Sequence, residues 1–526
     1  MNKKSLLFRG VFFGYAATAS QMFYSFASIP LALSYLSKTE FGMWSLITTL
    51  TMYLQMAEMG IVNAFMRHLF ECKDGKDPAR YGRLYTACIL AMFIVAGLVL
   101  LLGFLVSAFS APWLGIPLEL HGTYFKLMMG QSLLTALFQV TRMFGTPLYV
   151  YHRQDLASIS QIGLFLVWYV VLYIGFESGW GIYSMLASQA AGFLWFAPFS
   201  FYSCWKNGYY PLRNTWGLPA REEWLSVWRY SRDQLVLQFA GLVLMGLPQL
   251  LVSRLLGLEA AAVWAVCTRP FSILKQAFFR PFNVALPMLC DIFIRGEMKM
   301  VTKRWGDISQ MVVALSICGF AVAAANNSAF VSLWTRGELA WAETNNWMTA
   351  LYFTITTVAG VSFGTVGISM TFGNTRFIPI LQALVTLVVA YPLAKTWGMP
   401  GLILATSLPY LIGMIWFGVR YLASITGQPL RPLVTRAFLR PSLMVPLAVL
   451  AAWACSFLTP LLPGYFGLFL SSGTGFALSL LIATFIGVSQ DIRSEMTAII
   501  LRPFKRFMRS SQPVPVASPP DARDPE

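Results

Sequence analysis

Six ionisable side chains lie inside long apolar runs of this sequence, where a charged group is energetically unfavourable. They are Glu58, Lys126, Arg142, Arg269, Lys275 and Arg280, with Asp233 and Asp291 near the ends of such runs. A charge at the centre of a bilayer costs about 2.5 to 3.5 kcal/mol by insertion scales, so each is a candidate functional residue. Five of these six are cations. A cavity with several cations suits a phosphate-bearing substrate, because guanidinium and ammonium groups pair with phosphate oxygens.

Two of the arginines are predicted to share one face of a helix. Arg269 and Arg280 are eleven residues apart, which places them about 20° apart around the axis and roughly 16 Å along it. They could offer successive contacts to an anionic headgroup. Lys275 points about 240° away from Arg269 and is expected to have another role. An alternative for Arg142, Lys275 and Arg280 is that they extend to the cytoplasmic headgroups, and Lys126 could extend outward in the same way.

The acid Glu58 suggests energy coupling. A carboxylate inside a span could load and release a proton as access alternates between the two sides of a membrane. The alternative is an ion pair with a cation on a neighbouring helix, or a place near the inner interface. Arg142 shares its apolar run with a polar face that predicts a wet lining, formed by Gln131, Ser132, Thr135 and Gln139.

No metal, disulfide or cofactor site is predicted. The cysteines show no paired spacing and are expected to act as small apolar residues, at Cys72, Cys88, Cys204, Cys267, Cys290, Cys318 and Cys455. The histidines His68, His121 and His152 are scattered and build no site.

The elements that carry these residues are predicted to be membrane-spanning helices. The chain has 526 residues, of which 57% are hydrophobic and 11% charged, with a mean hydropathy of +0.62. This composition indicates an all-α polytopic membrane protein. Apolar runs and turn signals predict about fourteen helices, at 8–36, 41–66, 84–110, 122–148, 156–177, 181–203, 233–256, 260–290, 308–334, 347–373, 377–396, 400–419, 438–460 and 465–489.

Basic residues give these helices a direction. If the N-terminus is cytoplasmic, the inner segments hold most lysines and arginines, and the outer loops keep Lys38, Arg254, Arg336 and Lys395. Both termini are therefore predicted to be cytoplasmic. The net charge of +16 then faces anionic lipid headgroups, which disfavours nucleic acid as a partner. Tryptophans near the predicted interfaces are interpreted as an aromatic belt rather than as sugar-stacking residues, among them Trp44, Trp113, Trp334 and Trp347.

Three segments outside the central spans have their own character. The start of the chain imitates a secretory signal, but its apolar run continues to about Leu36, which favours an uncleaved first span. The segment from Cys204 to Arg232 mixes aromatic and basic residues, and Pro219 is expected to begin a short interfacial helix. The tail from Ser510 is rich in proline and charge and is predicted to be disordered.

Two halves of the chain repeat at an offset of about 220 residues. The paired features are Ser34-Tyr35-Leu36 and Ser253-Arg254-Leu255, Trp113-Leu114-Gly115 and Trp334-Thr335-Arg336-Gly337, and Gly179-Trp180-Gly181 and Gly398-Met399-Pro400-Gly401. Because each half holds an even number of helices, the repeat predicts two pseudo-symmetric six-helix bundles around a central cavity. The predicted units are a bundle at 1–203, a cytoplasmic interfacial linker at 204–232, a bundle at 233–420, helices 13 and 14 within 421–490, and a partly disordered cytoplasmic tail at 491–526.

A set of short motifs, spread over most of the chain, carries a family resemblance. They are Pro30-Leu31, Leu36, Glu40-Phe41-Gly42-Met43-Trp44, Glu58-Met59-Gly60, Arg67, Arg269 with Pro287, Leu333-Trp334, Gly373-Asn374-Thr375-Arg376, and Gly398 to Gly401. The pattern resembles the Wzx-type polysaccharide flippases of the multidrug/oligosaccharidyl-lipid/polysaccharide exporter superfamily. Two departures are Glu58, where the family more often has aspartate, and Ala260-Ala261, where it has an aromatic-glycine pair.

The resemblance implies a translocase that moves an undecaprenyl-diphosphate-linked oligosaccharide from the cytoplasmic to the outer leaflet by alternating access. It implies a place in a bacterial inner membrane and a role in lipopolysaccharide or exopolysaccharide synthesis. The partners would be the lipid-linked oligosaccharide, the lipid bilayer and polysaccharide polymerase or export machinery.

Two other functions stay open. One is a multidrug exporter of the same superfamily, driven by sodium or protons. Residues 8–36 hold no Asp or Glu, and a cationic cavity would repel cationic drugs. The other is a membrane glycan polymerase, glycosyltransferase or ligase. The short predicted outer loops carry no suitably spaced carboxylate pair, so a transporter rather than an enzyme is predicted.

Overall fold

The fold is given by a computed structural model that describes residues 3–58, 60–72, 77–218, 220–221, 224, 243–339, 342–369 and 377–494. Within these ranges all regular secondary structure is helical. Several sequence predictions lie wholly or partly outside the described residues. They concern the interfacial helix at Pro219, Asp233, the Gly373-to-Arg376 motif and the tail from Ser510.

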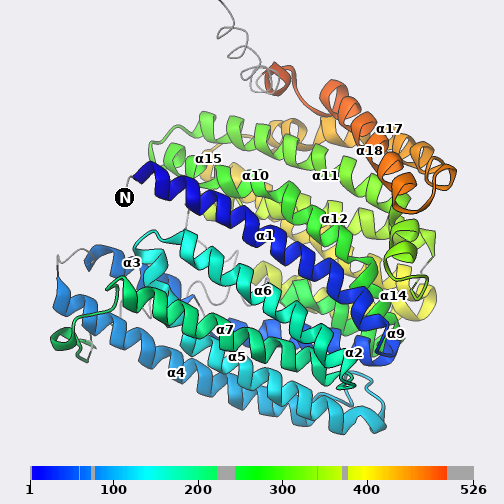
Figure 1. The fold of residues 1–526 in the computed structure, drawn as a ribbon. Coiled ribbons are helices and arrows are strands. Elements are labelled where there is room, and N and C mark those ends of the chain that lie inside the picture. The colour runs from blue at the N-terminus through cyan, green and yellow to red at the C-terminus, as the bar shows by residue number, and fades with distance from the viewer. Residues whose placement is uncertain are drawn as a thin grey trace, which may run out of the picture.

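The first half begins with one long helix and one broken helix. α1 is Lys3–Leu33, and the predicted second span is split into α2 (Lys38–Gln55), a 3-10 turn η1 (Met56–Glu58) and α3 (Ile61–Cys72). Gly60 lies at the break with a φ of +70°, which glycine adopts without steric strain. Four helices follow: α4 (Pro78–Phe109), α5 (His121–Val150), α6 (Gln154–Glu177) and α7 (Tyr183–Lys206) (Figure 1).

The second half follows the predicted ranges with two more breaks. Its helices are Val243–Leu256, α9 (Leu258–Cys267), α10 (Arg269–Ile294), α11 (Met298–Trp334), α12 (Glu343–Phe363), α13 (Val366–Ser369), α14 (Ile378–Pro409), the π-helical turn η5 (Tyr410–Ile415) and α15 (Trp416–Thr426). The helix predicted at 260–290 is divided between α9 and α10 at Thr268. The predicted turn between 396 and 400 is a sharp kink inside α14, where Gly398 has a φ of +59°.

The C-terminal addition contains two long helical segments. One runs through α16 (Leu430–Val434), the π-helical turn η6 (Thr435–Leu439) and α17 (Arg440–Ser456). The other is α18 (Gly464–Ile482) with the π-helical turn η8 (Ala483–Gly487).

Seven described helices are long and apolar enough to cross a membrane. They lie at Pro78–Phe109, Gln154–Glu177, Arg269–Ile294, Met298–Trp334, Ile378–Tyr410, Leu430–Leu461 and Gly464–Gly487. A polytopic helical membrane protein is therefore confirmed, and the number of fourteen spans stays a prediction.

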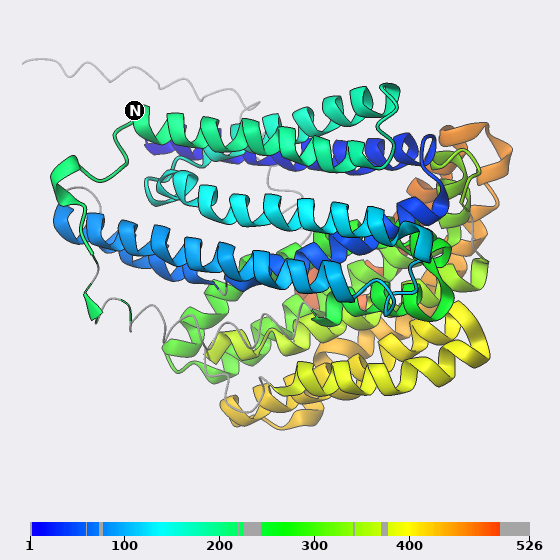
Figure 2. The same cartoon turned by 90° about the horizontal axis from the view of Figure 1, so that it is seen from below.

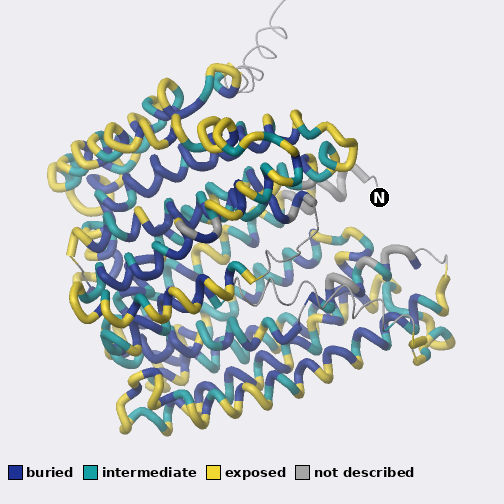
Figure 3. Tube along the Cα trace, turned by 180° about the vertical axis from the view of Figure 1, so that it is seen from behind, coloured by how far each residue is buried: buried dark blue, intermediate teal, exposed yellow. Residues whose placement is uncertain are grey.

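The helices pack as two bundles with a helical pair at one side. In the first bundle α6 lies between α1 and α7, and α5 packs on α4 and α7. In the second bundle α11 packs against α10, α12, α17 and α18 (Figures 1 and 2). The central apolar window of α11 is 72% buried, whereas exposed residues follow the outer helices (Figure 3). The exact domain boundaries proposed from the repeat stay a prediction.

Two helices that the repeat predicts to be equivalent pack against each other. α2 is the second helix of the first half, and it lies against α9, its counterpart in the second half. A Cβ atom at Gly42 would overlap the carbonyl oxygen of Leu258, so the two backbones are in close contact there. This contact between equivalent elements is typical of a pseudo-two-fold arrangement.

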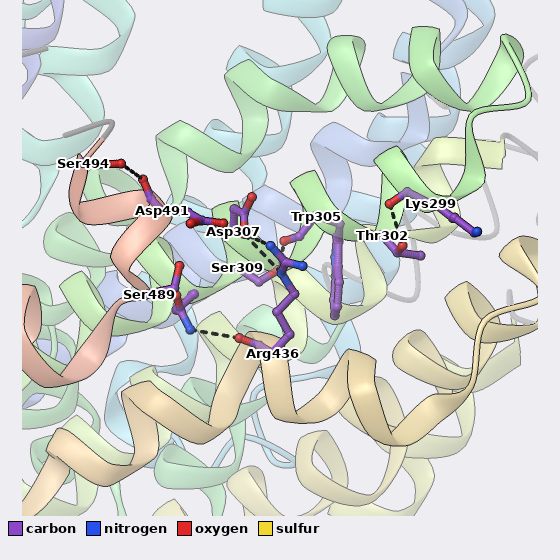
Figure 4. Close-up of polar contacts among 10 residues, drawn as sticks. Lys299, Thr302, Trp305, Asp307, Ser309, Arg436, Ser489, Asp491 and Ser494 are labelled. Carbon is purple, nitrogen blue, oxygen red and sulfur yellow. Dashed lines mark hydrogen bonds and ion pairs between the residues drawn. The ribbon is translucent and has the colours of Figure 1, made fainter. Parts of the chain in front are cut away.

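A cluster of polar contacts connects the C-terminal helices to α11. Arg436 of η6 donates from Nε and Nη2 to Asp307 Oδ1, at 3.2 and 2.9 Å (Figure 4). Gln310, one turn further along α11, donates to the carbonyl of Arg436 at 3.0 Å and accepts from the backbone N–H of Ser489 at 2.7 Å. The absence of a side chain at Gly306 leaves room for the stem of Arg436.

Candidate functional site

α1 and α2 form the boundary between the two bundles. Arg269 Nη2, at the start of α10, donates to the hydroxyl of Ser25 in α1 at 2.6 Å. Gln249 Nε2 donates to the hydroxyl of Ser45 in α2 at 2.7 Å. Both bundles contain a cavity. Gln21 of α1 and Gln55 of α2 line the cavity of the first bundle, and Tyr15 of α1 contacts Arg280, which lines the cavity of the second.

The first cavity, here called the N cavity, lies within the first bundle and has a volume of about 500 Å³. Its polar lining is rich in amides, from Gln21, Gln55, Gln139 and Gln161. Gln139 Nε2 donates to the backbone carbonyl of Gln55 at 2.9 Å. This carbonyl lies where α2 ends and η1 begins, so the break in the helix offers a backbone acceptor to the cavity wall.

Glu58 and Arg142 form an ion pair in the N cavity. Arg142 Nη1 donates to Glu58 Oε2, which joins η1 to α5. The carboxylate side chain is 10% exposed and the guanidinium side chain 46% exposed. This contact agrees with the alternative prediction for Glu58, an ion pair with a cation on a neighbouring helix. It leaves the N cavity without net charge from these two groups.

The second cavity, here called the C cavity, lies within the second bundle and has a volume of about 680 Å³. α10 supplies its long polar side chains, from Lys275, Gln276, Arg280 and Asn283. The opposite walls are aromatic, from Trp264, Tyr352, Phe353 and Tyr410 of α9, α12 and η5.

The two cations of the C cavity have no acidic partner among the described residues. Lys275 Nζ donates to the hydroxyl of Thr356 at 2.9 Å and lies 5.9 Å from the centroid of the Phe353 ring. The guanidinium of Arg280 lies 5.9 Å from the centroid of the Tyr15 ring. A cation stacked on an aromatic face keeps its charge available to a ligand on its other side.

The remaining predicted cations have different surroundings. Arg269 contacts α1 at Ser25 and Arg280 contacts it at Tyr15, in agreement with the common face expected from their spacing. Arg269 is exposed and lies between the bundles rather than in either cavity lining. Lys126 is exposed near the start of α5 and lines neither cavity.

Sequence reasoning missed most of the amide residues of the two linings. Of the polar face predicted on α5, Thr135 and Gln139 line the N cavity, whereas Ser132 does not. The sequence signal for the others was an uncharged amide inside an apolar run, as at Gln21, Gln161 and Gln276. Within the described residues no three His, Cys, Asp or Glu side chains gather as metal ligands would.

A comparison with known protein families identifies the family of this chain. The sequence profile of the family described as "Polysaccharide biosynthesis protein" matches residues 7–293, which is more than half of the chain. The chain belongs to this polysaccharide biosynthesis family. The matched region extends from α1 into α10, so it includes Glu58, Arg142 and Arg280. No curated protein sequence matches the chain.

Solved structures share the fold of this family member. An inward-facing multidrug resistance MATE family transporter of the MOP superfamily has a TM-score of 0.66 at 11% identity, over 77% of this chain and 96% of that one. The lipid II flippase MurJ, inward closed, has a TM-score of 0.63 at 12% identity, over 90% and 98%. An outward-facing MATE family transporter has a TM-score of 0.53 at 10% identity, over 80% and 96%. The chain therefore has the fold of transporters of the MOP superfamily, which is the multidrug/oligosaccharidyl-lipid/polysaccharide exporter superfamily.

Proposed function

We propose that this protein flips an undecaprenyl-diphosphate-linked oligosaccharide across a bacterial inner membrane, from the cytoplasmic to the outer leaflet. The observation that carries the proposal is the pair of cations in the C cavity, Lys275 and Arg280. They lie in a membrane bundle without an acidic partner among the described residues. A diphosphate supplies the missing negative charge and several acceptor oxygens.

The charge of the two cavities favours this substrate over a cationic drug. Among the described lining residues of the N cavity, Arg142 is the only cation, and Glu58 already neutralises it. An anionic headgroup is therefore attracted more strongly to the C cavity than to the N cavity. A cationic drug would be repelled by Lys275 and Arg280. Membership of the polysaccharide biosynthesis family supports the sugar-bearing lipid.

Alternating access is the mechanism that this architecture supports. The two bundles contact each other near the predicted outer loops. One such contact is the hydrogen bond that the Ser253 hydroxyl donates to the carbonyl of Leu114, at 2.7 Å. Separation of the bundles at this end would expose the cavities to the outer leaflet. Structural relatives that face inward and outward support such a cycle. Both termini would be cytoplasmic, and polymerase or export machinery would receive the product.

Transport in proteoliposomes tests the function. The purified protein should move a fluorescent lipid-linked oligosaccharide across the bilayer. Arg280→Gln and Lys275→Gln should each slow it about tenfold, because each removes one charge-assisted contact. Arg269→Ala should slow transport too, because this side chain contacts the other bundle at Ser25 and its neighbour Thr268 lines the C cavity. Lys299→Gln removes an exposed cation outside both cavities and should transport at the normal rate. Normal transport by the first two variants would contradict the proposal.

A further inference from the structure

A smaller cavity adjoins the N cavity in the first bundle. It has a volume of about 200 Å³, and we call it the amide pocket after three of its lining residues, Gln55, Gln131 and Gln189. The indole of Trp168 and the rings of Phe138 and Phe193 complete its walls. Gln55 and Phe138 also line the N cavity, so the two spaces are neighbours. Four helices, α2, α5, α6 and α7, build the pocket.

Two polar atoms of the amide pocket lack hydrogen-bond partners within the described part of the chain. Gln131 Nε2 donates to Gln189 Oε1 at 2.7 Å, but Gln131 Oε1 accepts nothing. Trp168 Nε1 has no acceptor. Gln131 is only 5% exposed, so bulk water does not compensate for the missing bond. Buried polar groups without partners call for an explanation. Here the Gln131 acceptor is left to a ligand, whereas the Nε1 edge of Trp168 packs against Gly192 of α7.

The aromatic walls of the amide pocket are held in place. The Trp168 ring lies 5.3 Å from that of Tyr24 and 5.4 Å from that of Phe165. Its Nε1 edge packs against Gly192 of α7, where any Cβ atom would overlap the indole. Phe138 is stacked on Phe196 with ring centroids 5.0 Å apart. Because these side chains are already fixed, little conformational entropy is lost when a flat, rigid ligand binds.

The lining of the amide pocket favours an uncharged ligand. Its described lining residues include no Asp, Glu, Lys or Arg. The nearest charges in the adjoining N cavity, Glu58 and Arg142, compensate each other. An uncharged group with apolar faces and several hydroxyl or amide groups on its edge matches these walls. A sugar ring has these properties, and a volume of about 200 Å³ suits one ring rather than a long glycan.

We propose that the amide pocket binds one sugar ring of the lipid-linked oligosaccharide while the C cavity holds the diphosphate. The inference rests on the proposed function and divides the substrate between the two bundles. α1 supports this division, because its Tyr15 contacts Arg280 of the C cavity and its Gln21 lines the N cavity. In this arrangement the amide pocket selects the glycan, and the cations of the C cavity select the diphosphate.

Native mass spectrometry of the full chain can separate the two contributions. The probes are undecaprenyl diphosphate and two versions of it that carry a single hexose or a single N-acetylhexosamine. The wild-type protein should bind at least one of the sugar-bearing lipids more tightly than the bare lipid. Gln131→Leu and Trp168→Phe should each reduce this preference about tenfold and leave the affinity for bare undecaprenyl diphosphate unchanged. Arg280→Gln should weaken binding of all three lipids.

Gln382→Leu is the matched control. Gln382 is a buried glutamine of α14 with an unpartnered Oε1, like that of Gln131, but it lines neither the amide pocket nor the two larger cavities. This variant should keep the wild-type preference for the sugar. If Gln131→Leu and Trp168→Phe keep it too, with wild-type thermal stability, the amide pocket holds only water and the inference is wrong. Equal wild-type binding of all three lipids would also overturn it, whereas failure to bind any of them would overturn the proposed function itself.

Discussion

The indole N–H of Trp334 donates a hydrogen bond of 2.7 Å to the backbone carbonyl of Phe26, across the boundary between the bundles. In a regular helix that carbonyl would accept from the N–H four residues later. The residue there is Pro30, inside α1, which has no N–H. Trp334 is 6% exposed, and its ring lies 5.4 Å from that of Phe26. The proline thus leaves an acceptor free in one bundle, and the other bundle uses it.

Trp334→Phe should weaken the closure of the bundles at this end. The variant keeps an aromatic ring but leaves the Phe26 carbonyl without its donor, which costs about 1 to 3 kcal/mol. If the contact breaks when the bundles separate, the population of the separated form should rise about 5- to 150-fold. Spin labels at Lys38 and Glu338, both exposed near the predicted outer loops, would measure that population by double electron–electron resonance.

Two further variants show whether the effect comes from this hydrogen bond. Trp113→Phe alters the equivalent tryptophan of the first half, which is 77% exposed, and should leave the label distances unchanged. Pro30→Ala restores an N–H that can bond to Phe26 within α1. In that background Trp334→Phe should cost less than it does in the wild type. Equal costs in both backgrounds would show that ring packing, and not the freed carbonyl, is responsible.

The Glu58–Arg142 pair should respond unequally to loss of either partner. Arg142→Gln leaves a carboxylate that is 10% exposed without its cation, whereas Glu58→Gln leaves a guanidinium that is 46% exposed and can contact water. Arg142→Gln should therefore lower the free energy of unfolding by about 1 to 3 kcal/mol, and Glu58→Gln by less. The double variant should recover much of the loss. Thermal unfolding of the purified protein in one detergent at neutral pH measures all four forms.

Energy coupling through Glu58 gives a separate prediction. If this carboxyl carries a proton during the cycle, Glu58→Gln should abolish the acceleration of transport by a pH gradient across proteoliposomes. Transport without a gradient should continue, since the cations of the C cavity are intact. Gradient-dependent transport at the wild-type level in this variant would remove Glu58 from the coupling mechanism.

The helices and one helical face were predictable from sequence because both depend on local patterns. Apolar runs located the spans, and an average of 3.6 residues per turn placed Arg269 and Arg280 toward the same neighbour. The breaks at Gly60 and Thr268 were missed because hydrophobicity continues through them. The aromatic-belt interpretation was wrong for Trp44 and Trp334, which are each 6% exposed inside the protein. Proximity of a tryptophan to a span end does not reveal whether lipid or another helix covers it.

The two cavities could not be assembled from sequence alone. Glu58 and Arg142 are 84 residues apart, and their pairing depends on how η1 lies against α5. The amide pocket takes its residues from four helices, so no short motif can contain it. The cationic character of Lys275 and Arg280 was visible in the sequence, but the absence of acidic neighbours required the packing of α10 against α12 and α1.

The Arg436–Asp307 pair should matter more for its shape than for its charge. Arg436 reaches Asp307 with two donors of its planar guanidinium, a geometry that a lysine ammonium cannot reproduce. Arg436→Lys should therefore lose much of the stability that Arg436→Ala loses, about 0.5 to 1 kcal/mol because the arginine is 41% exposed. Chemical denaturation of the purified protein measures the loss. A lysine variant as stable as the wild type would show that charge alone suffices.

The close contact between α2 and α9 should make Gly42 intolerant of any side chain. A Cβ at this position would overlap the carbonyl oxygen of Leu258, and neither backbone can move without shifting a whole helix. Gly42→Ala should therefore destabilise the protein by about 1 to 3 kcal/mol, although alanine is the better helix former. Gly97→Ala is the matched control, because Gly97 lies in α4 with open space around its Cβ position. That variant should be neutral or up to about 1 kcal/mol more stable.

The same pair of variants distinguishes a fixed contact from a moving one. If α2 and α9 stay together throughout transport, Gly42→Ala lowers the thermal unfolding temperature and the transport rate falls only with the amount of folded protein. If the two helices separate during the cycle, the substitution also favours the separated form, and the distance between spin labels at Lys38 and Glu338 increases in the folded fraction. The second outcome is expected, because α2 and α9 belong to the two bundles whose separation would open the outer end.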